Sequence, residues 1–502
     1  MGNKSSSKKV PEKLRYRQAD YPITTEIDLY NDDEAIEIRE SETKTISDIT
    51  PYDQKLQLLM KPALSYLQIN GTLPQEMPCQ LSMQASETSI SEETLRQGVD
   101  IICVIDVSGS MRGPKLELTK KTLEFMVNQL CEKDRVSLIA FNNIVTRIQP
   151  LIRMTPHGKA QTIEEIRNLE ANGGTDITGG LHHGIKTLED RKIVNKISSI
   201  VLLSDGRDKQ KDTSLDRGKA SIDSSSLKDY SIHTFGYGSG HDAQLLSAIS
   251  QLRNGGFYYV EKSESIPEAF SNCLGELMSA VADQIQVRLQ TQATDVSFSL
   301  TKVYSENGDS TFAMPPVLTG DKKEAIFILS FPSCQQQFPQ PYIISPVKGF
   351  IKYRLIRTGE EIEEECYLNI PVFNENDAID SIEIDEDVMV NFYRVKSAEI
   401  LKEAGELGDK GNMEGARNLL QKGADELKVS VVAENSIVKI LINDLENTKG
   451  RFLNEREYEH GGKAEVMSKA RGHFSKREQN VECYKNSCQK EISKCSKEYF
   501  AN

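Results

Sequence analysis

The sequence predicts an α/β protein: a Rossmann-like domain, with a mostly parallel sheet flanked by helices, inserted in or next to a β-sandwich and followed by a C-terminal helical segment. Three observations support this fold class. Buried-strand and helical patterns alternate over residues 98–283. Short strands with period-2 alternation lie on both sides, over 51–97 and 284–385. Apolar residues at 3.6-residue spacing then indicate helices over 386–450.

The alternating region contains a series of apolar, β-branched runs separated by amphipathic stretches. We expect strands at 99–106, 135–141, 144–152, 198–204, 232–237 and 256–261, and helices at 114–131, 158–170, 176–190, 242–252 and 266–282. Helical connections predict parallel crossovers, and the one short connection predicts an antiparallel hairpin at an edge of the sheet. The polar, Ser- and Asp-rich stretch before the fifth strand is expected to be a loop. About 185 residues suffice for one buried core.

The segments that flank the alternating region do not belong to it and are predicted to contain short strands. Their expected strands are 56–60, 64–69, 80–85, 285–289, 296–300, 325–331 and 349–353. Because these strands precede and follow the alternating region, we expect that region to be an insertion with both ends near the sandwich. The acidic runs 360–365 and 383–387 are interpreted as a solvated strand face and a linker, with an acidic docking patch as the alternative.

The last part of the chain is predicted to be helical and then polar. Apolar stripes and a turn at 408–412 predict an antiparallel hairpin or bundle over 386–450, which packs on the sandwich or binds a partner helix. Residues 451–502 are polar and mildly basic, and we expect a frayed tail. Three cysteines in that tail lack a recognised zinc spacing, so no metal site is predicted there.

A constellation of oxygen-bearing side chains follows the predicted strands. The first strand ends on Asp106, Ser108 and Ser110, whose carboxylate and hydroxyls suit a hard cation with an open coordination position. Thr175 lies where a helix begins, and Asp205 follows another buried strand. If the strands are parallel, all five residues lie at the carboxyl edge of the sheet, where open α/β sheets bind ligands. The alternative is that they merely end strands and cap helices.

This arrangement resembles the metal-ion-dependent adhesion site of von Willebrand factor A (VWA) domains. The resemblance implies a Mg²⁺ or Mn²⁺ ion, held directly by three hydroxyls and mostly through water by two carboxylates, from Ser108, Ser110, Thr175, Asp106 and Asp205. It also implies that an acidic residue of a protein partner completes the coordination. We expect Asp176 and His241 to line the rim of that ligand surface.

Further segments are similar to the cytoplasmic VWA proteins of plants and protists, whose plant members include RING-finger ubiquitin ligases. These segments are 173–181, 188–191, 198–206, 232–238, 240–243 and 269–275. No CxxC pair precedes the VWA region, so the RING and its ligase activity are not carried over. We therefore expect a non-enzymatic scaffold or adaptor that binds proteins through the metal. The alternatives are a substrate receptor or adaptor of a ubiquitin-ligase complex, or a hydrolase that uses the same metal but lacks a recognisable general base.

The resemblance also suggests a coupling between ligand binding at the metal and the β-sandwich. In the integrin-type members of the family, ligand binding at the metal shifts the C-terminal helix of the domain along its axis. Here the expected helix 266–282 runs almost without a linker into the strand 285–289. Such a shift would pull on the sandwich, whereas a rigid joint would hold the domain in one state.

Composition and the N-terminal residues predict the compartment. No apolar run approaches 20 residues, no signal sequence is recognisable, and nine scattered cysteines do not form a disulfide pattern, so we expect a cytoplasmic protein. The net charge of −14 argues against nucleic-acid binding. Residues 1–6 fit the myristoylation pattern at Gly2, and nearby lysines and arginines would supply a second signal for the inner membrane surface. We expect residues 1–50 to be a disordered tail, and the alternative to lipidation is that Gly2 is a chance glycine in it.

Overall fold

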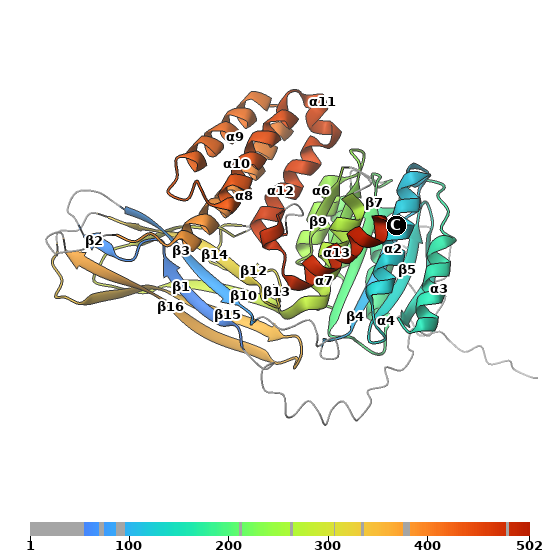
Figure 1. The fold of residues 1–502 in the computed structure, drawn as a ribbon, viewed down its shortest axis with the longest axis horizontal. Coiled ribbons are helices and arrows are strands. Elements are labelled where there is room, and N and C mark those ends of the chain that lie inside the picture. The colour runs from blue at the N-terminus through green and yellow to red at the C-terminus, as the bar shows by residue number, and fades with distance from the viewer. Residues whose placement is uncertain are drawn as a thin grey trace, which may run out of the picture.

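The computed structural model of this protein describes residues 55–69, 75–86, 96–209, 213–261, 265–305, 307–332, 336–374, 382–477 and 481–501. The predicted N-terminal tail, including Gly2, lies outside these residues. Figure 1 shows a β-sandwich at one end, an α/β domain at the other and a helical bundle that packs beside both. Among the described residues, no helix combines the length and the apolar character needed to cross a membrane.

The α/β domain (residues 99–279) is built on a six-stranded sheet with the order β6-β5-β4-β7-β8-β9. Neighbouring strands are parallel except for the β5–β6 hairpin. The strands are β4 (Val99–Asp106), β5 (Arg135–Phe141), β6 (Val145–Arg153), β7 (Ile197–Ser204), β8 (Ser231–Tyr237) and β9 (Phe257–Val260). This topology confirms the predicted mostly parallel sheet with one antiparallel edge.

Helices cover both faces of this sheet and explain why β4 is apolar at successive positions. They are α2 (Pro114–Gln129), α3 (Pro156–Arg167), α4 (Ile177–Asp190), α5 (Ser214–Asp223), α6 (Ala243–Leu252) and α7 (Ile266–Ser279), with a short 3₁₀ helix, η4, at Gly109–Met111. Ile101, Cys103 and Ile105 join one apolar core, whereas Ile102 and Val104 join the other. Alternate side chains of β4 therefore point to opposite faces, as in a strand covered on both sides.

The sandwich consists of two sheets whose inner faces share one apolar core. One sheet has the order β1-β3-β14-β11, from β1 (Gln57–Pro62), β3 (Gln75–Gln84), β14 (Lys322–Phe331) and β11 (Ser299–Val303). The other has the order β12-β10-β15-β16-β2, from β12 (Thr311–Met314), β10 (Ala280–Thr291), β15 (Tyr342–Leu355), β16 (Glu361–Asn374) and β2 (Leu67–Ile69), with β13 (Val317–Leu318) paired to β10. The acidic face of β16 is exposed at Glu361, Glu363 and Glu365.

The α/β domain is an insertion in the sandwich. Its first strand follows β3, and β10 begins at Ala280, directly after α7 ends at Ser279. The domain and the sandwich are therefore joined by a continuous helix-to-strand connection.

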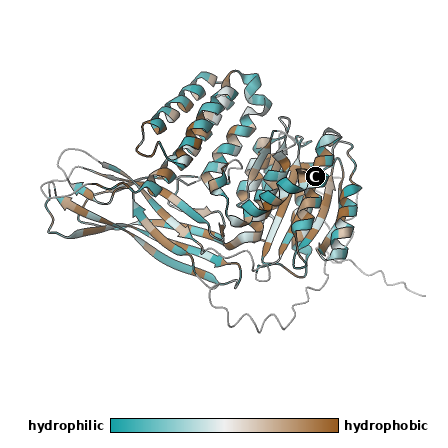
Figure 2. Ribbon diagram, viewed as in Figure 1, coloured by the Kyte–Doolittle hydropathy of each residue, from teal (hydrophilic) through white to brown (hydrophobic). Residues whose placement is uncertain are grey.

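The helical bundle contains more of the chain than its sequence suggests. It begins with α8 (Glu386–Asp409), α9 (Met413–Lys428) and α10 (Ser436–Thr448), as the apolar stripes predict. After short helical turns at Lys449–Phe452 (η7), Glu455–Glu457 (α11) and Tyr458–Gly462 (η8), the chain continues in α12 (Lys463–Ser475), a turn at Glu482–Tyr484 (η9) and α13 (Ser487–Ala501). Figure 2 shows that these helices mix hydrophobic and hydrophilic residues.

The prediction of a frayed tail over 451–502 is wrong for the described residues of that range. Tyr458 and Val466 are buried in the core of the bundle, and Ile492 is buried in the core of the α/β domain. Few apolar residues suffice here because α12 packs on α8, and α13 packs on α7. The stabilising contacts come from distant parts of the chain, so local periodicity does not reveal them.

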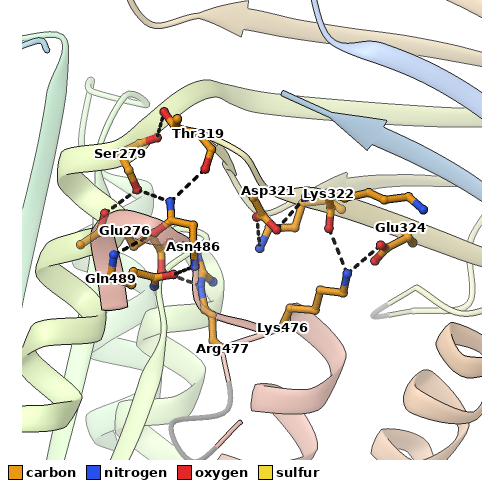
Figure 3. A network of polar contacts seen from close by, with 12 residues as sticks. Glu276, Ser279, Thr319, Asp321, Lys322, Glu324, Lys476, Arg477, Asn486 and Gln489 are labelled. Carbon is orange, nitrogen blue, oxygen red and sulfur yellow. Dashed lines mark hydrogen bonds and ion pairs between the residues drawn. The ribbon is translucent and has the colours of Figure 1, made fainter. Parts of the chain in front are cut away.

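A polar network joins the three parts where α7 meets β10 (Figure 3). Asn486 Nδ2 donates hydrogen bonds to Ser279 Oγ at 2.8 Å and to the carbonyl of Thr319 at 3.2 Å. Arg477 Nε donates to Glu276 Oε2 at 2.9 Å. These contacts tie the C-terminal segment to the end of α7 and to the sandwich.

Candidate metal centre

The candidate metal centre lies at the carboxyl ends of β4 and β7, in the middle of the parallel sheet. β4 and β7 are neighbours, and the connection after β4 leads to β5 on one side whereas the connection after β7 leads to β8 on the other. Such a point leaves a crevice outside the strand ends, where α/β folds bind ligands. Asp106 is the last residue of β4, and Asp205 directly follows β7.

Asp106 is buried and held by hydrogen bonds from two neighbouring segments. Its Oδ1 accepts from the backbone N–H of Ser108 at 2.8 Å, and its Oδ2 accepts from Ser204 Oγ at 2.5 Å. Burial raises the pKa of Asp106 to about 6, although the hydrogen bonds from Ser108 and Ser204 oppose this change; the charge of Asp205 adds to it. A nearby cation would favour the ionised carboxylate.

Two serine hydroxyls form a bridge toward the second carboxylate. Ser108 Oγ lies 3.0 Å from Ser110 Oγ, and Ser110 Oγ donates to Asp205 Oδ1 at 2.6 Å. Ser110 is exposed, whereas Ser108 and Asp205 are buried. The structure thus brings four of the five predicted ligands into one connected group, with its open side at Ser110.

The fifth predicted ligand, Thr175, is carried by a loop that is held against both other loops. The carbonyl of Gly173 accepts from Gly109 N–H at 3.0 Å, and the carbonyl of Thr175 accepts from Lys209 N–H at 2.9 Å. A Cβ atom on Gly206 would lie 2.8 Å from Thr175 Oγ1, so the hydroxyl lies against the residue that follows Asp205. Gly173 has φ +75°, a left-handed conformation that favours glycine.

Lys115 also belongs to the site, although the sequence interpretation did not include it. It lies in the first turn of α2, and its Nζ is 2.5 Å from Asp205 Oδ2. Its position after Pro114, a residue favoured at helix starts, places it beside the metal loop in the sequence. Which carboxylate it reaches depends on the packing of α2 against the sheet, and a helix pattern alone does not reveal this.

The structure does not support the prediction that Asp176 and His241 line the rim of a ligand surface. Each is only 5% exposed. Asp176 is the N-cap of α4, where it accepts from Gly179 N–H at 3.1 Å, and it pairs with Lys209 Nζ at 2.7 Å. His241 Nδ1–H donates to the carbonyl of Gly238 at 2.7 Å, and burial lowers the pKa of His241 to about 4. Both residues are thus engaged in contacts within the loops that follow the strands.

The donor set fits a hard divalent cation. Within the described part of the chain, no group of three or more His, Cys, Asp or Glu side chains could hold a metal ion. A cation at this edge would therefore depend on hydroxyls as well as on the carboxylates of Asp106 and Asp205. Oxygen ligands of this kind suit Mg²⁺ or Mn²⁺ better than softer metals.

Comparison with known proteins identifies this domain. Residues 100–272 match the model of the von Willebrand factor type A domain family. The chain therefore contains a VWA domain, and VWA domains commonly bind a divalent cation and mediate protein–protein interactions.

Among curated proteins, the chain is similar to plant and cyanobacterial relatives. It is 25% identical over 268 residues to the E3 ubiquitin-protein ligase WAV3 of Arabidopsis thaliana, a match that covers 51% of this chain and 34% of that protein. It is 34% identical over 122 residues to WAVH1 of the same plant, covering 22% of this chain and 18% of that ligase. An uncharacterized protein of Synechocystis is 25% identical over 347 residues, covering 66% of this chain and 78% of the relative. The chain thus spans about a third or less of the Arabidopsis proteins.

Two solved structures share most of the fold. A von Willebrand factor type A protein from Catenulispora acidiphila has a TM-score of 0.56 at 17% identity, with 80% of this chain and 91% of that chain covered. The ArnB paralog VWA2 from Sulfolobus acidocaldarius has a TM-score of 0.52 at 15% identity, with 85% and 99% covered. Because the coverage exceeds the VWA region, the likeness of fold extends to the flanking parts.

Proposed function

We propose that this protein is a metal-dependent protein-binding scaffold or adaptor. The observation that carries the proposal is the convergence of Asp106 and Asp205, from different strands, through the hydroxyls of Ser108 and Ser110. These four side chains, with Thr175 beside Gly206, would hold a Mg²⁺ or Mn²⁺ ion at the carboxyl edge of the sheet.

A carboxylate of a partner protein is the ligand that best completes this site. Asp205 is already paired with Lys115, so the site offers a divalent cation less negative charge than its two carboxylates suggest. An acidic side chain that approaches from the exposed Ser110 side would supply both an oxygen ligand and the missing charge. The side chains of Arg112 and Arg207 are also exposed on the loops of the site and favour an acidic surface.

We do not propose metal-dependent hydrolysis. That reaction needs a general base beside a metal-activated water. Asp176 and His241 are the two ionisable groups that the sequence predicted at the rim of the site. One is engaged with Lys209 and with the start of α4, and the other is buried beneath the loops. Binding therefore explains the arrangement better than turnover.

A second candidate function is that of an adaptor or substrate receptor in a ubiquitin-ligase complex. The similarity to WAV3 and WAVH1, which are named as E3 ubiquitin-protein ligases, favours this candidate. It is compatible with the first, since a substrate receptor also binds proteins. Recovery of ubiquitin-ligase subunits with the tagged protein would support it.

The test is affinity capture with the wild-type protein and with Asp106→Asn, in Mg²⁺ and in EDTA. We expect partners that the wild type retains only in Mg²⁺, and that Asp106→Asn loses in both conditions. Ser224→Ala, at an exposed serine after α5, is the control and should behave as the wild type. A partner set that is unchanged by EDTA and by Asp106→Asn would contradict the proposal.

A further inference from the structure

Lys115 contacts the candidate metal centre from outside the predicted ligand set. Its ammonium group lies 2.5 Å from Asp205 Oδ2, and the lysine side chain is 36% exposed while the aspartate side chain is fully buried. An ion pair with one partner buried and the other partly in solvent holds a positive charge at the edge of the site. This charge is part of the protein and is present whatever the site binds.

The two oxygens of Asp205 have different partners. Oδ1 accepts from Ser110 Oγ at 2.6 Å, whereas Oδ2 faces Lys115. The carboxylate is also fixed by its burial and by its position directly after β7. Its orientation therefore has supports other than the lysine, and removal of the ammonium should change the charge of the site more than its geometry.

We propose that Lys115 is an internal counter-ion that weakens cation binding at this centre and so makes retention of the cation depend on an acidic partner. The inference rests on the proposed function. The two carboxylates of the site together with the ammonium group of Lys115 carry a net charge of about −1 toward a divalent ion, whereas the carboxylates alone would carry −2. Two cations beside one carboxylate also repel each other, and this repulsion is strong where the carboxylate is buried. A carboxylate from the partner would restore the missing charge.

The ammonium group of Lys115 is also accessible to a partner. A Cβ atom placed on Gly238 would lie 3.8 Å from Lys115 Nζ, and the 36% exposure of the lysine side chain shows that it borders solvent. From there it can pair with Asp205 or with an acidic group on the partner. Lys115 thus determines which ligand the site prefers: a cation alone is disfavoured, and a cation with an anionic partner is favoured.

The test measures cation affinity directly, by calorimetric titration of chelator-treated full-length protein with MgCl₂ and with MnCl₂. Lys115→Met keeps the length of the side chain and removes its charge, and it should bind both ions about tenfold more tightly than the wild type. Lys115→Arg keeps the charge and should stay within about threefold of the wild type. The control is Lys120→Met on the same helix, where the lysine pairs with Glu117 at 3.1 Å, and it should match the wild type.

The outcomes separate the inference from the function on which it rests. Equal or weaker affinity of a folded Lys115→Met protein, compared with the wild type, would overturn the inference and leave the metal site intact. Binding by Lys115→Met alone would support it. If neither protein binds at millimolar concentrations, both the inference and the metal site are wrong. Thermal unfolding with and without MgCl₂ is the second readout: the ion should raise the Tm of Lys115→Met more than that of the wild type.

Discussion

Asp106 and its hydroxyl neighbours show how single residues build a site at the end of a strand. The carboxylate is buried, yet Ser108 and Ser204 give it hydrogen bonds that lessen the cost of charge in the interior. The serines on the loop continue this chain of contacts to Asp205. Because the serine hydroxyls are small and neutral, they leave space for a cation and do not neutralise the negative charge of Asp106 and Asp205.

Removal of both loop hydroxyls should weaken cation binding and leave the fold intact. Ser108→Ala plus Ser110→Ala deletes two oxygen ligands and the bridge to Asp205, and we expect Mg²⁺ affinity to fall by at least about tenfold. The circular dichroism spectrum should not change, because the residues lie on a loop beyond the apolar core. Calorimetric titration with Mg²⁺ or Mn²⁺ measures the loss. Unchanged affinity would remove these serines from the ligand set.

His233 should make the protein sensitive to acid. The ring is buried, accepts a hydrogen bond from Gly256 N–H at 3.1 Å, and burial lowers the pKa of His233 to about 4. In the unfolded chain the pKa is about 6.5. The unfolded state therefore binds the proton first, and stability decreases as the pH falls from about 6.5 to about 4.

The measurement is urea unfolding of the wild type and of His233→Asn at several pH values across this window. Asparagine retains a hydrogen-bond acceptor but does not titrate, so the decrease should be smaller in the variant by about 2–3 kcal/mol at the acidic end. His182 and His241 also have lowered pKa values, so some acid sensitivity should remain. Parallel curves for the two proteins would show that His233 does not contribute.

The sequence predicted which side chains lie together at the carboxyl edge of the sheet better than it predicted their neighbours, and their role as metal ligands stays a prediction. Asp106, Ser108 and Asp205 are recognisable because their places after buried strands define them. Lys115 was missed, and the rim role of His241 is not supported, because burial and the reach of a long side chain depend on how helices pack over the sheet.

Helix α4 positions the loop of Thr175 through its close packing on the sheet. It begins directly after Thr175 and Asp176 and packs on β4 and β5 so closely that Gly180 has no room for a side chain. A Cβ atom on Gly180 would lie 2.9 Å from Val104 Cγ1 and 2.8 Å from the Phe141 ring. Close contact of helix and sheet thus fixes the position of the loop that carries Thr175.

Gly180→Ala should therefore destabilise the domain although alanine is a better helix former. The gain in helix propensity is about 1 kcal/mol, and overpacking costs about 1–3 kcal/mol, so we expect a net loss of up to about 2 kcal/mol in the free energy of unfolding. Gly450→Ala is the matched control, because a Cβ atom there meets nothing within 4 Å. Urea unfolding compares the two. Equal midpoints would mean that α4 adjusts without cost.

Helices and strands could be predicted from the sequence where the segment itself carries a clear pattern of apolar residues. The strands at 99–106 and 135–141 have the observed bounds because short, mostly apolar runs define them. Helix α5 lies in the stretch expected to be a loop, since Ser214, Gly218 and Ile222 are its buried residues and form a weak pattern. Helices α12 and α13 were missed for the related reason that their partners, α8 and α7, lie far away in the sequence.

The whole molecule is organised around α7, which leads directly into the sandwich. Helix α13 packs along it so closely that a Cβ atom on Gly275 would lie 2.6 Å from Gln489 Cγ. Arg477 and Glu276 form a buried ion pair beside this contact (Figure 3). An axial shift of α7 would have to break these contacts, so the structure favours the rigid joint over the shifting helix.

Loss of the ion pair should loosen α7 specifically. Arg477→Met leaves Glu276 buried without its partner, a change that costs about 3–5 kcal/mol in comparable pairs. We expect faster hydrogen exchange across 266–279 and little change in β4 and β7, because Arg477 donates its hydrogen bonds to Glu276 of α7 and to the carbonyl of Asn254. Adding Glu276→Gln to Arg477→Met removes the unpaired charge and should restore much of the protection. Arg456→Ala, at an exposed arginine, should exchange as the wild type does. Equal exchange in all four proteins would mean that the apolar contacts with α13 alone hold α7 in place.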